Sequence, residues 1–474
     1  MNTKALRQKV LDLAIHGKLV PQNPNDESAT VLLEKIRAEK AEKIKKGELK
    51  ADKKDSFIFV GSDKRHYEQF ADGTVKDIED EIPFEVPDGW AWCRLNELAD
   101  IARGGSPRPI ENYITDSPDG INWIKIGDTA PESKYIESAK EKIKPEGQKH
   151  SRFVHEGDFL LTNSMSFGRP YILNINGCIH DGWLVFANIK ECVIKDYLYY
   201  ALSSDYIYAS FSMVAAGSTV KNLKSDTVKQ VLFPLPPIKT QEKIVESIEK
   251  SFTQIDILDN EKLDLQAAIK QAKSKILDLA IHGKLVPQDP NDEPAEELLK
   301  RIATSDNRPY EKVESSEIDW TLPNNWCLCH FGDIATVING KNQSKVENPD
   351  GKYPIYGSGG IMGRADDFIC PENCTIIGRK GSINNPIFVE EKFWNVDTAF
   401  GLCPSEAVLP KFLYYFCEYF DFTTLDSSTT LPSLTKTNIQ QIVLALPPID
   451  EQKRILDKTE ELFGILDEIV LNLI

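Results

Sequence analysis

Two polar loops of the chain carry side chains of the types that contact nucleic acids. The loops run from 162 to 169 and from 378 to 385, and each combines glycine with Arg, Asn, Ser or Lys. These side chains hydrogen-bond to phosphate oxygens and to the edges of bases. Shorter segments at 103–108, 218–221, 341–345 and 429–430 offer similar groups. The candidate DNA-binding residues are Arg103, Ser106, Arg108, Asn163, Ser164, Ser166, Arg169, Ser218, Lys221, Lys341, Asn342, Lys345, Arg379, Lys380, Ser382, Asn384 and Thr429. Each could equally be a solvated loop residue that makes no contact.

Motifs for catalysis are weak. The string nearest to the loop of an amino-methyltransferase, Asn384-Asn385-Pro386-Ile387, lacks the second proline and the aromatic residue. The glycines of 357–363 miss the spacing of a nucleotide-binding loop, so we interpret them as turns. A metal-dependent nuclease could be assembled from Asp128, Glu132 and Lys134, but a chain this rich in charge produces Glu-x-Lys by accident. We therefore predict no catalytic residues and no metal site.

Cysteine and histidine also favour structural roles. Cys-x-Cys at 327–329 and Cys-x-x-x-Cys at 370–374 depart from the common zinc spacing, so small buried hydrophobic residues are the better interpretation. His16 and His282 each precede a glycine, where a histidine can interact with the carbonyls at a helix C-terminus. The nine cysteines of the chain fit reduced thiols better than a disulfide framework.

The elements that position these loops repeat along the chain. LDLAIHGKLVPQ at 11–22 recurs at 277–288, and 16 of 17 positions are identical when the comparison is extended to 27 and 293. Leu-Pro-Pro-Ile recurs at 235–238 and 446–449, and Pro-Asp-Gly-Trp at 87–90 is similar to Pro-Asn-Asn-Trp at 323–326. Two globular modules of one plan therefore lie between these anchors.

A long helix is predicted between the modules, over 239–283. Its apolar residues step by three and four, as in a coiled coil, and no proline occurs between 237 and 287. Such a rod would be about 65 Å long. Its first part matches the C-terminal segment and its last part matches the N-terminal segment, so the repeat is circular. We expect the two termini to lie side by side against the central helix, as an antiparallel pair.

The net charge of −17 argues at first against a nucleic-acid partner. However, segments 68–100, 286–320 and 440–474 carry −8, −6 and −4, so the rest of the chain sums to +1. Neutral modules with local Arg and Lys are compatible with DNA binding. No apolar run is long enough for a membrane span, and the N-terminus lacks the apolar block of a signal peptide. We expect a cytoplasmic protein.

Taken together, the chain resembles the specificity subunit of type I DNA restriction-modification systems. The repeated LDLAIHGKLVPQ, the module starts at 87–90 and 323–326, and the module ends FPLPPIKTQEKI (233–244) and LALPPIDEQKRI (444–455) carry the resemblance. It implies an α+β fold with two mixed α/β target recognition domains separated by an antiparallel pair of coiled-coil helices, in a circular pseudo-twofold repeat. The corresponding segments are a helical segment (1–40), a charged linker (41–86), domain 1 (87–238), a central helix with the following segment (239–299), a linker (300–322), domain 2 (323–449) and a terminal helix (450–474).

The resemblance implies a subunit that is not catalytic by itself and that reads a bipartite, asymmetric sequence in double-stranded DNA. Its implied partners are two methyltransferase subunits, which use S-adenosylmethionine, and restriction subunits, which use ATP and Mg²⁺; no cofactor is implied for this chain. Three alternatives stay open: a subunit of a methylation-only system, a protein-binding scaffold, and the nuclease described above.

Overall fold

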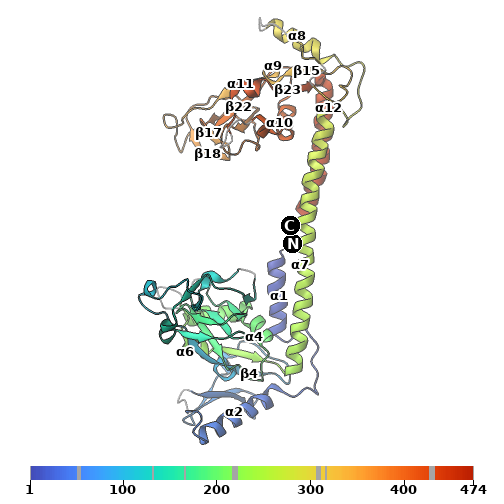
Figure 1. The fold of residues 1–474 in the computed structure, drawn as a ribbon. Coiled ribbons are helices and arrows are strands. Elements are labelled where there is room, and N and C mark those ends of the chain that lie inside the picture. The colour runs from blue at the N-terminus through green and yellow to red at the C-terminus, as the bar shows by residue number, and fades with distance from the viewer. Residues whose placement is uncertain are drawn as a thin grey trace. The chain divides into compact units, whose positions relative to one another are not determined.

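The computed structural model describes residues 2–50, 55–130, 133–164, 167–215, 222–305, 311–314, 318–425 and 433–472. The chain divides into two compact units, Met1–Asn260 (unit 1) and Glu261–Ile474 (unit 2). Each unit mixes helices with short sheets (Figure 1). The predicted long helix is confirmed as α7 (Ile238–Ile281), whose 44 residues contribute to both units. Among the described residues, no helix is both long and apolar enough to cross a membrane.

Unit 1 begins with two helices and a small sheet, and a larger mixed region follows. Its elements before α7 are α1 (Thr3–Ile15), α2 (Ala29–Lys45), β1 (Ser56–Val60), β2 (His66–Phe70), β3 (Val75–Asp77), β4 (Ala91–Arg94), α3 (Leu95–Leu98), β5 (Asp100–Arg103), β6 (Ile121–Ile124), β7 (Tyr135–Ile136), β8 (Glu141–Ile143), β9 (Arg152–Val154), β10 (Phe159–Thr162), β11 (Pro170–Leu173), β12 (Gly177–Ile179), β13 (Trp183–Ala187), α4 (Lys195–Leu202), α5 (Asp205–Ala215), α6 (Ser225–Lys229) and β14 (Leu232–Leu235).

Unit 2 follows a similar order with fewer strands among the described residues. After α7 come α8 (Ala295–Ser305), β15 (Cys327–His330), α9 (Phe331–Ile334), β16 (Ala335–Asn339), β17 (Tyr353–Gly357), β18 (Gly360–Ala365), β19 (Cys374–Gly378), β20 (Ile387–Val389), β21 (Trp394–Asn395), β22 (Ala399–Pro404), α10 (Pro410–Tyr419), α11 (Lys436–Gln440), β23 (Val443–Leu446) and α12 (Ile449–Asn472).

The central sheet of unit 1 has the strand order β5-β13-β10-β11-β7 and is buried on both faces. Successive side chains of a strand point to opposite faces. Phe159 and Leu161 of β10 therefore pack in one core with α4 and α5, while Leu160 packs in a second core. That second core also holds Ile124 and Ile179, from the sheet with the order β8-β6-β12-β9. The continuous apolar runs in the sequence reflect this double burial.

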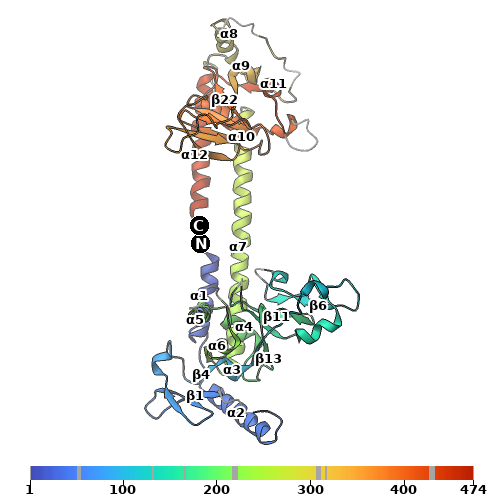
Figure 2. The same cartoon turned by 90° about the vertical axis from the view of Figure 1, so that its left-hand side faces the viewer.

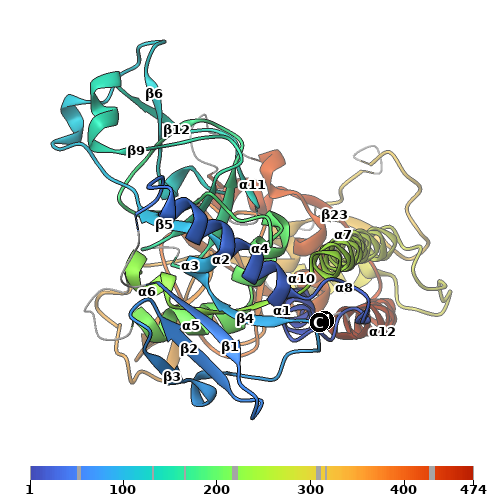
Figure 3. The same cartoon turned by 90° about the horizontal axis from the view of Figure 1, so that it is seen from below.

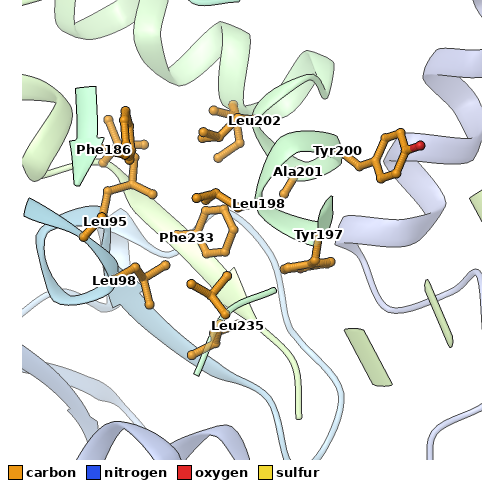
Figure 4. Packing of buried hydrophobic residues seen from close by; sticks show 14 of the residues in the cluster. Leu95, Leu98, Phe186, Tyr197, Leu198, Tyr200, Ala201, Leu202, Phe233 and Leu235 are labelled. Carbon is orange, nitrogen blue, oxygen red and sulfur yellow. The ribbon is translucent and has the colours of Figure 1, made fainter. Parts of the chain in front are cut away.

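Figure 4 shows the first of these cores at the junction of the sheet and the helices. Phe233 of β14 is fully buried and lies among Leu198 of α4 and Leu95 and Leu98 of α3. The ring of Tyr197 meets the ring of Phe233 edge-on, with the centroids 5.9 Å apart. Removing a buried ring of this kind costs about 3–5 kcal/mol, so this core fixes β14 and α4 firmly.

Unit 2 repeats the arrangement with its sheet β16-β22-β19-β20. Phe400 and Leu402 of β22 pack in the core that contains α10, whereas Ala399 and Cys403 pack in another core with Cys374. All nine cysteines of the chain are buried and free, in agreement with the interpretation of Cys327, Cys329, Cys370 and Cys374 as small buried residues.

The range 41–86, expected as a charged linker, differs from that expectation. It contains the antiparallel sheet β1-β2-β3, which Figures 2 and 3 show on the side of unit 1 away from β6 and β12. Glu68 of β2 is 2% exposed and accepts a hydrogen bond of 2.7 Å from Arg94 of β4, and Ser56 donates to the same carboxylate at 2.6 Å. Ile58 and Ile78 complete the attachment by packing with the apolar residues of β4 and β14. A buried pair of opposite charges thus joins the small sheet to the module.

The proline-rich module ends are held by one glutamine each. Gln241, in the first turn of α7, accepts the N–H of Ile194 at 2.8 Å and donates to the carbonyls of Cys192 and Pro236. Gln452, in the first turn of α12, makes the matching set of bonds with Leu409, Ala407 and Pro447. Gln241 therefore joins α7 to the loop before α4, and Gln452 joins α12 to the loop before α10.

The two repeated histidines end helices, as predicted. Nδ1 of His16 lies 2.7 Å from the carbonyl oxygen of Asp12 at the end of α1, and Nδ1 of His282 lies 2.7 Å from that of Asp278 at the end of α7. The next residue in each case is a glycine with positive φ, 66° at Gly17 and 64° at Gly283. The sequence His-Gly thus terminates both helices by one mechanism.

Candidate nucleic-acid interface

In unit 1, four of the predicted residues converge on Asp181, in the turn between β12 and β13. Ser106 donates to Asp181 Oδ1 at 2.8 Å, and Arg108 donates to Oδ2 at 3.3 Å. The guanidinium of Arg103 donates to the main-chain oxygen of Asp181 at 2.8 Å and lies 3.7 Å from Oδ2. The arginine side chains are 50% and 78% exposed, for Arg103 and Arg108 respectively. Two cations are thus held at the surface by one aspartate, through its carboxylate and its main-chain oxygen.

Asn163 completes this cluster from the end of β10. Its side chain is fully buried and donates to the carbonyl of Asp181 at 2.8 Å, while its Oδ1 has no hydrogen-bond partner among the described residues. The main chain of Asn163 bonds on both sides, from its N–H to Gly182 O at 2.9 Å and from Leu223 N–H to its own carbonyl at 2.9 Å. Asn163 therefore supports the Asp181 turn and is covered rather than presented to solvent.

The electrostatics of the turn are set by burial and by its neighbours. Burial raises the pKa of the Asp181 carboxyl, but the hydrogen bond from Ser106 and the charge of Arg103 outweigh it, and the pKa is lowered overall. Burial lowers the pKa of the adjacent His180, whose Nδ1 lies 2.6 Å from the N–H of Gly182. A neutral imidazole beside an ionised carboxylate is the state that this geometry favours.

The other candidates of unit 1 are less clearly gathered. Ser164 and Arg169 are half-buried, and the guanidinium of Arg169 lies over the ring of Tyr171, 5.4 Å from its centroid. Three further candidates, Ser166, Ser218 and Lys221, lie outside the described residues.

In unit 2, Arg379 occupies the position that Asn163 has in unit 1. Its N–H donates to Thr398 O at 2.8 Å, and Leu434 N–H donates to its carbonyl at 2.9 Å, which repeats the backbone bonds of Asn163. Its side chain is exposed, as are those of Lys380 and Ser382 in the same loop. The equivalent of Asp181 is Asp397, which is also exposed. One backbone frame thus holds a buried asparagine in unit 1 and an exposed arginine in unit 2.

A second basic segment of unit 2 follows β16. The main chain of Lys341 is fixed on both sides, because its N–H donates to Asn395 O at 2.9 Å and its carbonyl accepts Trp394 Nε1–H at 2.9 Å. The side chains of Lys341, Asn342 and Lys345 are exposed. The Asn342 side-chain oxygen accepts the N–H of Ser344 at 2.9 Å, which fixes the turn.

One candidate has a structural role instead. Asn384 donates to Asp421 Oδ1 at 2.5 Å and accepts the N–H of Phe422 at 2.8 Å, so both ends of its amide are used within the unit. The last candidate, Thr429, lies outside the described residues.

The nuclease alternative gains no support from the geometry. Asp128 accepts the N–H of Lys125 at 2.8 Å, and Lys134 forms an ion pair with Asp196. Glu132 lies outside the described residues. Within the part of the chain that the structure describes, no group of three His, Cys, Asp or Glu side chains could hold a metal ion.

Sequence reasoning did not identify Asp181 as the centre of the cluster. The only signal was its alignment with Asp397 between the modules, because the contacts join loops that are about 75 residues apart in the sequence. Arg152 was also missed; it donates to the carbonyl of Arg103 at 3.1 Å and adds a further cation beside this cluster.

Comparisons with known proteins agree on one family. The family model for the type I restriction modification DNA specificity domain matches residues 87–267 and 323–470. The type I restriction enzyme EcoAI specificity subunit of Escherichia coli is 25% identical, over 97% of this chain and 88% of its own length. The MjaIX specificity subunit of Methanocaldococcus jannaschii is 23% identical, over 82% and 89% of the two chains.

Solved structures show the same fold. A chain from a structure of a type I R-M system, described in terms of its complex assembly and conformational transition, has a TM-score of 0.55 at 18% identity and covers 82% of this chain and 94% of its own. The HsdS subunit from Thermoanaerobacter tengcongensis has a TM-score of 0.50 at 17% identity, with coverage of 82% and 92%. With two family-model matches that together span most of its length, this chain belongs to the type I restriction-modification specificity subunits.

Proposed function

We propose that the two units each read one half of a split, asymmetric DNA sequence on behalf of a type I restriction-modification complex. The observation that carries this proposal is the backbone frame that Asn163 and Arg379 share, around which the two units expose different side chains. Unit 1 exposes Arg103 and Arg108 beside the buried Asn163, whereas unit 2 exposes Arg379 itself. Two readers of one architecture but different surface chemistry would recognise two different half-sites. The exposed Arg103 and Arg108 in unit 1, and Lys341, Arg379 and Lys380 in unit 2, are suited to phosphates and guanine edges.

We further propose that an antiparallel helix pair, arranged in a circular repeat, carries the two DNA-reading units. Within unit 1, Arg7 pairs with Asp256, and Lys243 lies 3.9 Å from Asp26. The N-terminal segment and α7 therefore run in opposite directions. The same four repeat positions recur in unit 2.

In unit 2, Lys273 pairs with Asp467 at 2.5 Å and Arg454 pairs with Asp292 at 2.6 Å. The positions differ from those of unit 1 by the offsets 266 and 211 found in the sequence. A cation–π contact recurs in the same way. The Arg7 guanidinium lies 4.9 Å from the centroid of the Phe252 ring, and the Lys273 ammonium lies 4.9 Å from the centroid of the Phe463 ring. These matched contacts support a circular pseudo-twofold repeat.

The partners and cofactors follow from the family. We propose that two methyltransferase subunits, which use S-adenosylmethionine, dock on the near-identical helical segments, because two copies of one partner need two equivalent surfaces. Restriction subunits using ATP and Mg²⁺ would join the complete complex, and this chain itself would bind no cofactor.

Methylome sequencing of cells that carry the intact system tests the proposal. We expect one bipartite motif with two different half-sites and a fixed unread gap. Footprinting of the assembled complex on that sequence should then show two protected patches. A single contiguous motif, or the absence of protection in both halves, would contradict it.

A further inference from the structure

The hairpin β17–β18 of unit 2 exposes two consecutive apolar side chains. Ile361 and Met362 are 66% and 63% exposed, although neighbours in a regular strand point to opposite faces. The strand register explains this, because Tyr356 pairs with Ile361 and Ile355 pairs with Gly363, which leaves Met362 as an extra residue. Such a β-bulge redirects side chains and is common next to functional sites.

The tip of this hairpin lies against the basic loops of unit 2. A Cβ on Gly357 would lie 2.6 Å from Met362 Sδ, so the methionine crosses the end of β17. A Cβ on Gly378 would lie 3.1 Å from Ser358 Cβ, which places the turn of the hairpin beside the loop that begins with Arg379.

The segment at Lys341 joins the same end of the unit through β21. Val396 N–H donates to Tyr356 O at 3.0 Å, and Asn395 O accepts the N–H of Lys341 at 2.9 Å. An exposed apolar pair thus adjoins two loops whose lysine and arginine side chains are also exposed. The turn itself is narrow, because Gly359 and Gly360 carry no side chains and a Cβ at either would meet no atom within 4 Å.

This combination fits double-stranded DNA better than an apolar surface on another protein, because phosphates complement the flanking cations. The major groove accepts a two-stranded ribbon, and the thymine methyl is the apolar group that base edges present there. We propose that the β17–β18 hairpin enters the major groove of the half-site read by unit 2, where Ile361 and Met362 contact thymine methyl groups. This inference rests on the proposed function and adds specificity-determining residues to it.

The test combines protein and DNA changes in a double-mutant cycle. The complete complex, with wild-type chain or with Ile361→Ser and Met362→Ser together, is bound to duplexes in which each thymine of the half-site is replaced by deoxyuridine, which lacks the methyl group. Wild type should lose about three- to tenfold in affinity at one or two positions, as expected for one buried methyl. The double variant should bind the unmodified duplex more weakly and show no further loss with deoxyuridine.

Val60→Ser provides a matched control, because Val60 is a 59% exposed residue of the β1–β2 hairpin in unit 1. It should leave every deoxyuridine effect unchanged. Folding of the Ile361, Met362 variant is checked with a duplex in which only the half-site read by unit 1 is changed. A folded variant should lose as much affinity from that change as wild type does.

Three results would overturn the inference: a half-site without thymine, wild-type binding that deoxyuridine does not change, or a double variant that stays sensitive to it. In each of these cases the proposed function still holds if wild type discriminates both half-sites. Failure of wild type to discriminate either half-site would instead contradict the proposed function itself.

Discussion

Asp181 illustrates how a negative charge can serve the surface that we propose for reading DNA. Its carboxylate holds Arg108, and its main-chain oxygen and carboxylate together hold Arg103, before any partner arrives. Both pairs are exposed, and an exposed ion pair is worth only about 0–1 kcal/mol, so a phosphate could replace the carboxylate at little cost. Because the arginine side chains are already partly ordered in the free protein, the entropic cost of ordering them on binding would be smaller.

We expect Asp181→Asn to weaken discrimination while strengthening non-specific binding. Both guanidinium groups lose their charged partner, although Arg103 keeps its bond to the main-chain oxygen of residue 181. The local charge rises by one, so the slope of log K against log salt should steepen by about one. Titrations of target and unrelated duplexes over a salt series measure both effects. Asp119→Asn, which changes an exposed carboxylate of the same unit, controls for charge alone. Equal effects of the two variants would contradict the anchoring role.

Acid should loosen the Asp181 turn through His180. Burial lowers the pKa of His180 below its ordinary value of 6.5, so the folded state binds fewer protons than the unfolded state. The contribution of His180 to stability is therefore complete above about pH 6.5 and is lost as the pH falls toward the lowered pKa. Lys125, Asp128 and Asp181 are the charged groups that act on this imidazole.

Hydrogen exchange of the 180–183 amides between pH 7 and pH 5, corrected for intrinsic rates, measures this effect. Protection should decrease in wild type as the pH is lowered, and it should be nearly constant in His180→Gln. The exposed His155 offers the control, since His155→Gln should keep the wild-type dependence. If His155→Gln also removed the pH dependence, the dependence could not be attributed to His180.

At the scale of elements, sequence reasoning succeeded where a pattern is local or repeated. The helix α7 follows from its 3.6-residue periodicity, whereas the module limits taken from the repeated motifs stay a prediction. The sheet β1–β3 was missed because its attachment is a buried ion pair, Glu68 with Arg94, in a stretch that is rich in charge. Burial of a charge depends on a partner 26 residues away, which local composition does not report.

The two glutamines that join helices to modules should matter equally. Gln241→Ala leaves the N–H of Ile194 and the carbonyls of Cys192 and Pro236 without this partner, at a cost of about 2–4 kcal/mol. Hydrogen exchange in 192–202 of the full chain measures the loss, because the two units need not unfold together. The exposed Gln254 of α7 is the control, and a similar loss in Gln254→Ala would remove the special role of Gln241.

Gln452→Ala should have the matching effect in unit 2, at 407–416, and leave exchange in 192–202 unchanged. An effect confined to one of the two variants would show that the matched bonds carry different weights in the two units.

For the whole molecule, the circular repeat that we propose predicts that the position of the chain ends is free to change. In the repeat frame, Ile474 corresponds to 263 and Met1 to 267, which leaves three residues between them. A permuted chain that runs 264–474, a three-residue Asp-Leu-Gln link and then 1–263 should assemble with its partners and give the same methylated motif. A permutant opened within β10 is the control and should fail, because that strand lies in the middle of a buried sheet. Loss of the motif in the first permutant would contradict the circular arrangement.

The backbone frame shared by Asn163 and Arg379 has a consequence for how such proteins change. Main-chain amides and carbonyls hold both loop positions. The Arg379 side chain is exposed, so its identity contributes little to keeping its loop in place, whereas the buried Asn163 side chain also bonds to the Asp181 carbonyl. We therefore expect a substitution at Arg379 to alter what is recognised with little penalty in folding, and to leave untouched the helices on which we propose that the partners dock. Recognition would thereby be separated from assembly. New target sequences could arise by single substitutions while the surfaces for the partner subunits stay the same.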